Sequence, residues 1–438
     1  MLRFQLTFTN GLIIACMAIA AHVLVVVFSR KISPLGVIGA VYLAVAPFSV
    51  ATELWFVPVL KVVRMYSVGL LFVLSIMFFR LARLRSTTMF LLAYLLFSLL
   101  AAVWSENAAQ AALFKIQPLV TIMCGVFLAY SADTPDRVRH LLRIFSISAM
   151  VFALLIWVQL IWTPSAMGYM GRLRAFGINA NRIGQSAAPF LVLTAYVALY
   201  DRVKAWKVLG YIASALLAVV VVSSGSRGAV GESLIGLVAL GMPLVRQPIV
   251  LAVVCTLGTV TAVGVQDYVV GRAAERIADT DMTQSNREIP WTKAIGHFRE
   301  SPIYGKGWVF ETRKRQEGSR SNMHSMYLQA LAETGLIGFV LLVFACLFTG
   351  IRYLRVYFRN QRFTGGDSIV YFGAAISAAV MAHGVIEFGT ITGTTVNAIC
   401  FGFGVGLLDQ LRRWGAERAR QVQTHVPAPP GMGTMPAA

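Results

Sequence analysis

Long apolar segments recur along almost the whole chain, from residue 11 to residue 408. Each is about 17–25 residues long, which as a helix is enough to cross a hydrocarbon core of roughly 30 Å. Of the 438 residues, 57% are hydrophobic and 13% are charged, whereas about 25% are charged in a typical soluble domain. The sequence therefore predicts an all-α polytopic membrane protein.

The apolar segments give thirteen candidate spans, but the short segments near the start make about twelve transmembrane helices equally consistent with the pattern. Residues 1–28 contain Arg3 and an apolar run without a small-residue cleavage site, so we expect a retained first helix. The amphipathic piece Trp55–Tyr66 is a candidate for a helix along the membrane surface. The candidate spans are residues 11–28, 34–50, 66–80, 87–103, 111–130, 141–162, 183–200, 206–222, 229–245, 248–266, 326–350, 368–387 and 391–408.

The basic residues predict which ends of the spans face the cytoplasm, because Lys and Arg are enriched in cytoplasmic loops. The C-terminal tail has four arginines opposed only by Glu417, and residues 352–362 have four arginines and no acid. Residues 80–85 and 137–143 are also net basic. Alternation from these cytoplasmic segments then places residues 163–182, 223–228 and 267–325 outside.

The segment 267–325 is the longest polar stretch and separates the N-terminal spans from the C-terminal spans. Its ten basic and eight acidic residues nearly balance, as in a translocated domain. Inside it we expect a helix over Trp291–Phe298, followed by irregular backbone over Ser301–Gly307. The predicted parts are an N-terminal helix bundle (1–266), a partly helical loop domain (267–325), C-terminal helices (326–410) and a disordered cytoplasmic tail (411–438).

Several classes of function lack support in the sequence. The five cysteines lie in apolar segments without CxxC spacing, which predicts neither a disulfide framework nor a zinc site. The net charge of +19 comes from residues beside helix ends, as lipid contacts and orientation require, so nucleic-acid binding is disfavoured. The chain has no HExxH, GxGxxG or Walker sequence. Asp279 and Asp281 form a lone DxD, which arises readily by chance in a polar loop.

Arginines are the main charged residues at the outward span ends. Positive charge is disfavoured on that side, so several arginines there suggest an anionic ligand. A guanidinium group can hold phosphate oxygens through two hydrogen bonds, which favours a diphosphate. The alternative is that each arginine contacts lipid headgroups or a loop carboxylate, and this alternative is favoured for Arg172. The remaining candidates are Arg174, Arg182, Arg227 and Arg287.

Of six histidines, only His297 and His324 are predicted to face outward. A lone histidine is more often a structural hydrogen-bonding group than a catalyst. His324, however, stands where the polar loop ends and an apolar helix begins. The partial positive charge of a helix N-terminus near Asn322 or Ser325 disfavours the imidazolium form, which leaves a neutral base.

The apolar helix after His324 contains further candidate residues. Helical spacing places Tyr327, Leu328 and Leu331 on roughly the same face as His324, and Gly335 and Gly338 would allow close helix approach. Glu333 points to another side, where a buried carboxylate is favoured as a structural hydrogen-bonding group.

The pattern His324, Tyr327–Leu328, Glu333 and Gly335, preceded by Ser285–Arg287, Trp291, Ala294, Pro302 and Gly305–Gly307, resembles the O-antigen ligase and polymerase superfamily. Its hallmark is a long periplasmic loop that ends in His-x-x-Tyr-Leu-x-x-x-x-Glu-x-Gly. Gly177–Asn181 and Ser226–Gly228 agree with it further upstream. Ser325 departs from the family pattern, in which Asn often follows the histidine.

This resemblance implies a GT-C-like glycosyltransferase in the bacterial inner membrane, with its active site facing the periplasm. It implies inverting, metal-independent transfer of a glycan from undecaprenyl diphosphate to the lipid A core, without a cofactor. His324 would be the general base, and Arg287, Arg227, Arg182 and Arg174 would hold the diphosphate. Tyr327, Asn181, Trp291 and Glu333 would support the site.

Other reactions and functions stay open at this point. A polymerase or a protein O-oligosaccharyltransferase of the same superfamily would use the same donor with another acceptor. A transporter of anionic lipids would also need outward arginines, but it would carry charges along a path through the spans and show related halves. The chain shows no internal repeat and few charges within its spans.

Overall fold

The computed structural model describes residues 34–54, 56–78, 86–162, 172–244, 288–308, 325–362, 368–387 and 395–424. Within these ranges the backbone forms α-helices and short 3-10 helices, and no β-sheet. The α-helices are α2 (Pro34–Val45), α3 (Val57–Phe78), α4 (Ser86–Leu100), α5 (Ala108–Ser131), α6 (Pro135–Trp162), α7 (Ala180–Tyr200), α8 (Lys204–Ser223), α9 (Arg227–Gly241), α12 (Glu288–Glu300), α13 (Met326–Arg362), α14 (Ile369–Ile386) and α15 (Val396–Thr424).

The helices have the length and composition of membrane spans. In the described part of the chain, eight helices are long and apolar enough to cross a membrane, and α2, α14 and α15 contribute shorter apolar helices. The predicted all-α polytopic membrane fold is confirmed. Eleven of the thirteen candidate spans coincide with α2–α9 or α13–α15, whereas 11–28 and 248–266 lie outside the described residues.

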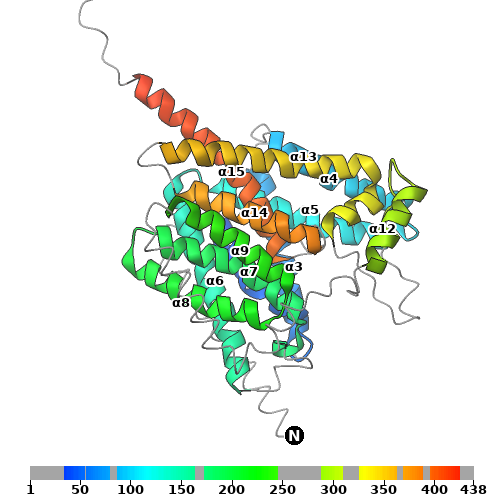
Figure 1. Cartoon of the computed structure of the whole chain (residues 1–438), viewed down its shortest axis with the longest axis horizontal. Helices are drawn as coiled ribbons and strands as arrows, with labels where there is room; N and C mark the ends of the chain where they lie inside the picture. The colour runs from blue at the N-terminus through cyan, green and yellow to red at the C-terminus, as the bar shows by residue number, and fades with distance from the viewer. Residues whose placement is uncertain are drawn as a thin grey trace, which may run out of the picture.

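Helix α7 is the most enclosed of the long spans, with most of its residues buried. It packs against α6, α8, α9, α14 and α15, and α5 and α15 pack along one another on another side of the bundle. Glycines allow this second contact, because a Cβ atom at Gly402 would lie 1.9 Å from the Ile122 carbonyl oxygen. Backbones this close are typical of membrane helices with small residues at their interface. Figure 1 shows α15, in orange and red, extending beyond the bundle at its C-terminal end.

Helix α3 corrects the prediction of a surface helix at Trp55–Tyr66. Val57–Phe78 is a single helix, so this piece is the first half of a span. Its exposed apolar residues include Val62, Tyr66, Val73 and Met77, which is the pattern of a lipid-facing side. Arg64 in the same helix donates to Ser49 Oγ at 2.8 Å, so its charge faces a polar partner inside the bundle.

Two helices also run further than their candidate spans. Helix α13 continues to Arg362, through the basic connection expected after residue 350. Helix α15 continues to Thr424, well past residue 410, where we expected an irregular tail to begin. In both helices the added turns contain four arginines, and arginine favours helix formation.

Candidate functional site

One end of the bundle gathers the segments that the sequence predicted to face outward. Helices α7, α9 and α13 begin there, and α14 ends there. The Leu173 amide donates to the Ser223 carbonyl at 3.0 Å, and Gln185 Nε2 donates to Glu387 Oε2 at 3.5 Å. We call this the site end of the bundle.

Arg174 and Arg182 flank the start of α7. Asn179 is the N-cap of this helix, because its side chain accepts from the Asn181 amide at 2.9 Å. The Phe176 carbonyl just before the cap accepts from the amides of Thr52 and Glu53 at 3.2 and 3.3 Å. These bonds hold the segment before α7 against the start of α3, and both arginine side chains are exposed there.

Arg227 is the first residue of α9 and is half-buried. Ser226 caps the helix through its Oγ, which accepts from the Ala229 amide at 3.4 Å. The unpaired amides of a helix N-terminus attract anions, and an arginine in the first turn adds a full positive charge. The start of α9 is therefore an electropositive position at the site end.

Arg172 connects two of these segments to one another. Its Nε donates to the Ser224 carbonyl at 3.0 Å, and its Nη2 donates to Asn181 Oδ1 at 2.5 Å. The guanidinium group thus joins the turn between α8 and α9 to the start of α7. Among the residues that the structure describes, the partners of Arg172 are a backbone carbonyl and the side chain of Asn181, rather than the lipid headgroup or loop carboxylate that we expected.

A carboxylate lies behind the arginine of α7. Arg182 is attracted by the charge of Glu387, which follows α14, and repelled by that of Arg64 from α3. Glu387 is 3% exposed, whereas Arg182 is exposed. Glu387 contacts α7 through Gln185, three residues after Arg182, and the charges of Arg64, Arg182 and Glu387 sum to a net positive charge.

Helix α13 begins immediately after the predicted catalytic segment. Ser325 is buried, and its Oγ accepts from the Leu328 amide at 3.4 Å, so it stands in the N-cap position directly after His324. Tyr327 donates from its hydroxyl to the Met381 carbonyl at 3.2 Å, which ties this first turn to α14. His324 itself lies outside the described residues.

Glu333 lies two turns further along α13 and forms an ion pair with Lys115 of α5. Both side chains are almost completely buried, at 2% and 5% exposure. Gln329 Nε2 donates to Glu333 Oε1 at 3.0 Å, so both carboxylate oxygens have a partner. Glu333 thus stabilises the contact between α5 and α13.

Helix α13 is broken at Gly335, where the backbone has φ 61° and ψ −160°. The segment 302–308 supplies the missing partners. The amides of Lys306 and Gly307 donate to the Ala332 and Glu333 carbonyls at 3.0 and 2.9 Å, and the Leu336 amide donates to the Pro302 carbonyl at 2.8 Å. We expected Gly335 to allow close approach of a helix, but the close neighbour is this loop segment.

The same segment is anchored beyond α13. The Trp308 amide donates to Ser105 Oγ at 2.6 Å, and the Trp308 ring stacks on Phe114 of α5 at 4.8 Å between centroids. Helix α12 precedes the segment and packs against the first turns of α13 through Ala294, Leu328 and Ala332. Figure 1 shows α12 beside the N-terminal end of α13. Trp291, also in α12, is half-buried.

Replacing Gly335 with alanine should destabilise this arrangement. A Cβ atom would lie 2.4 Å from the Ile303 carbonyl oxygen, and the backbone angles are accessible almost only to glycine. We expect a loss of at least about 1–3 kcal/mol in the free energy of unfolding, measured in detergent. Gly350→Ala in the same helix is the matched control, because a Cβ atom there meets nothing within 4 Å. An equal effect at both positions would contradict the role of the break.

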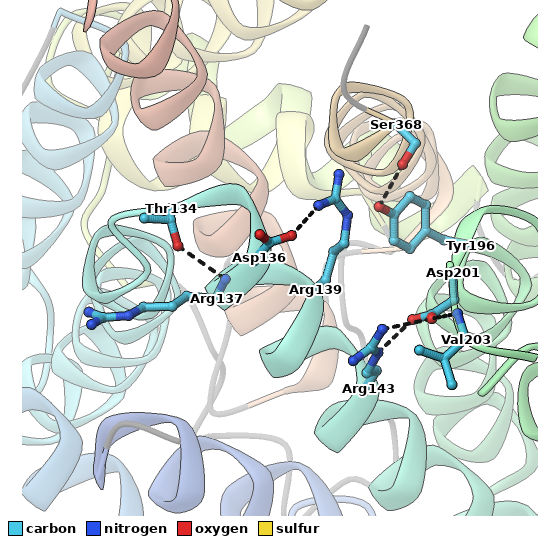
Figure 2. Close-up of polar contacts among 9 residues, drawn as sticks. All are labelled: Thr134, Asp136, Arg137, Arg139, Arg143, Tyr196, Asp201, Val203 and Ser368. Atoms are coloured by element: carbon cyan, nitrogen blue, oxygen red, sulfur yellow. Dashed lines mark hydrogen bonds and ion pairs between the residues drawn. The ribbon is translucent and has the colours of Figure 1, made fainter. Parts of the chain in front are cut away.

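The opposite end of the bundle is held by a second set of polar contacts (Figure 2). Arg143 of α6 binds Asp201 through two hydrogen bonds of 2.7 and 2.8 Å. Burial raises the pKa of Asp201, but the hydrogen bonds from Arg143 and the Val203 amide lower it by more. The pKa is therefore below its ordinary value. Tyr196 and Ser368 join α7 to the start of α14 at 3.1 Å. These residues lie away from the site end.

Residues 212–343 match a family model described as O-antigen ligase. The resemblance to the O-antigen ligase and polymerase superfamily is confirmed. The matched stretch runs from α8 into α13 and contains Arg227, Tyr327 and Glu333. No curated protein matches the sequence.

Some residues of the predicted site lie outside the described residues, as do both aspartates of the DxD. The site residues are His324 and Arg287, and the aspartates are Asp279 and Asp281. Among the residues that the structure describes, no group of three or more His, Cys, Asp or Glu side chains is placed to hold a metal ion.

Sequence reasoning missed Lys115, Glu232, His383 and Glu387. Each is an ionisable residue inside or at the end of an apolar span, and such residues are costly to place in a membrane. That cost could have identified these four residues from the sequence. We applied it to the arginines at span ends and did not extend it to these single residues.

Proposed function

We propose that this protein is an O-antigen ligase, an inverting glycosyltransferase that transfers a glycan from undecaprenyl diphosphate to the lipid A core. The bacterial inner membrane would hold the bundle, with the site end facing the periplasm. The observation that carries the proposal is the gathering of Arg174, Arg182 and Arg227 at the end where α13 begins, directly after His324.

In the proposed reaction His324 takes the proton of an acceptor sugar hydroxyl. The hydroxyl oxygen then forms a bond to the anomeric carbon of the donor glycan, and the bond from that carbon to the phosphate oxygen breaks. The electron pair leaves with the diphosphate, whose charge the arginines stabilise. A single displacement inverts the anomeric configuration, and positive charge from arginine removes the need for a metal.

The arginines have different surroundings, and each of these suits contact with a diphosphate. Arg174 and Arg182 are exposed, so they can meet a large lipid-linked substrate at the bundle surface. Arg227 adds the N-terminus of α9, whose amides also attract phosphate oxygens. Arg287 would contribute from the loop domain. Asn181, Tyr327, Trp291 and Glu333 would hold the surrounding helices in place.

A reconstituted assay with purified protein, undecaprenyl-diphosphate glycan and lipid A core tests the proposal. We expect glycan to appear on the lipid A core, and we expect transfer to persist in EDTA. Loss of transfer in EDTA would contradict the metal-independent mechanism and direct attention to Asp279 and Asp281. Absence of transfer to the core, with elongation of the carrier-linked glycan, would indicate a polymerase instead.

Deletion in cells separates the alternatives. Loss of O-antigen from lipopolysaccharide, with long polymer still accumulating on the carrier, is expected of a ligase. Loss of chain length alone is expected of a polymerase. Loss of glycan from protein alone is expected of an O-oligosaccharyltransferase. If the protein were a transporter, its deletion would keep the polymer from every acceptor. The purified protein would then not transfer glycan.

A further inference from the structure

Three polar side chains contact one another in the apolar interior of the bundle, next to the site end. Glu232 of α9, His383 of α14 and Asn397 of α15 are each at most 2% exposed. His383 Nδ1 lies 2.7 Å from Glu232 Oε2, and Asn397 Nδ2 donates to the same oxygen at 3.2 Å. We call these residues the buried triad.

The buried triad is costly for the fold. A carboxylate in an apolar interior needs a polar partner, and His383 Nδ1 lies nearest to Glu232. Even so, Glu232 Oε1, Asn397 Oδ1 and His383 Nε2 have no hydrogen-bond partner among the residues that the structure describes. Apolar residues of similar volume would pack these helices at least as stably. A polar cluster with unpaired oxygens therefore suggests a purpose other than stability.

Two members lie near a predicted diphosphate-binding arginine, Glu232 along its own helix and His383 through residues that contact α7. Glu232 lies five residues after Arg227 in α9, so it is held by the same turns that present this arginine. His383 lies one turn before Glu387, whose amide donates to the His383 carbonyl at 2.9 Å. Glu387 in turn attracts Arg182 and accepts from Gln185 of α7.

We propose that the buried triad positions Arg227 and Arg182 relative to one another, so that both guanidinium groups meet one diphosphate. The triad links α9, which carries Arg227, to the end of α14, where Glu387 contacts Gln185, three residues after Arg182 in α7. Asn397 adds the start of α15 to the same contact. The triad touches no substrate, and it acts through the two arginines. This inference rests on the proposed function.

A double-mutant cycle tests the proposal. His383→Gln removes the imidazole with a side chain of similar size, and we expect it to raise the KM for undecaprenyl-diphosphate glycan about tenfold, with a smaller change in kcat. In an Arg182→Ala background the same change should have an effect of less than about twofold, because the arginine to be positioned is missing. A purely structural role would give the same factor in both backgrounds, and that result would overturn the proposal.

Three further variants complete the experiment. Glu232→Gln/His383→Gln leaves no unpaired charge and replaces the single variant if the latter does not fold. Asn397→Ala keeps the contact between Glu232 and His383 but removes the bond from α15, and a smaller rise in KM is expected. Asp201→Asn is the matched control, since Asp201 is as deeply buried against Arg143 at the opposite end. It should lower Tm and leave KM unchanged.

The outcomes also separate this proposal from the proposed function. If Arg182→Ala and Arg227→Ala raise KM but the triad variants do not, the triad has no positioning role and the diphosphate site stands. If the arginine variants leave KM unchanged, the diphosphate site itself is wrong, and the triad proposal falls with it. A lower Tm without a change in KM in all triad variants would also overturn the proposal.

Discussion

Replacing His324 with alanine is expected to lower the rate of glycan transfer by about 10²–10⁴-fold, the usual contribution of general-base catalysis. The hydroxyl of a sugar is a poor nucleophile until its proton is removed, and no other side chain is proposed for that task. The change should act on kcat, because His324 does not hold the diphosphate. Transfer to lipid A core in the reconstituted assay measures it, with the KM for the carrier followed in parallel.

His297→Ala is the matched control for this prediction. His297 is the other histidine predicted to face outward, and it lies in α12 near the first turns of α13. Its replacement should leave the transfer rate within about twofold, because it is not proposed to contact the acceptor. Full transfer by His324→Ala, or an equal loss in both variants, would show that His324 is not the base.

Glu333→Ala should cause the largest loss of stability among single substitutions in the described helices that we consider. It would leave the Lys115 ammonium group buried without its carboxylate, and breaking such a pair costs about 3–5 kcal/mol. Unfolding of the protein in detergent measures the effect. The double variant Lys115→Met/Glu333→Leu should recover most of the loss, because it removes both charges and keeps the volume.

Asp133→Asn provides the comparison for an exposed ion pair. Asp133 Oδ2 lies 3.0 Å from Arg137 Nη1, but the two side chains are 48% and 59% exposed. Water screens their attraction, so the substitution should change the free energy of unfolding by at most about 1 kcal/mol. If Glu333→Ala were no more destabilising than Asp133→Asn, the buried pair would not hold α5 against α13.

Most of the fold could be predicted because hydrophobic length is a strong local signal. The ends of the apolar runs 111–130 and 183–200 lie within a few residues of the ends of α5 and α7. The prediction failed at Trp55–Tyr66, where Lys61 and Arg64 made the segment look like a surface helix. Whether a basic residue finds a partner inside the bundle depends on distant residues, in this case Ser49 of a preceding turn.

The site was less predictable, for the same reason. Arg174, Arg182 and Arg227 could be recognised from charge at span ends, and the structure brings their segments to one end of the bundle. The buried polar pairs around the site were not recognisable, because Lys115 and Glu333 are 218 residues apart in the chain and Glu232 and His383 belong to separate spans. No local pattern encodes such pairs.

The break at Gly335 divides α13 into two mechanical parts. The short first part, which follows His324, is bonded to the segment 302–308, to α5 and to α12. The long second part continues as the membrane span. Because the two parts are not one rigid rod, a tilt of the span in a thicker or thinner bilayer is not passed on directly to the first part. The position of the first part should therefore depend little on the thickness of the surrounding bilayer.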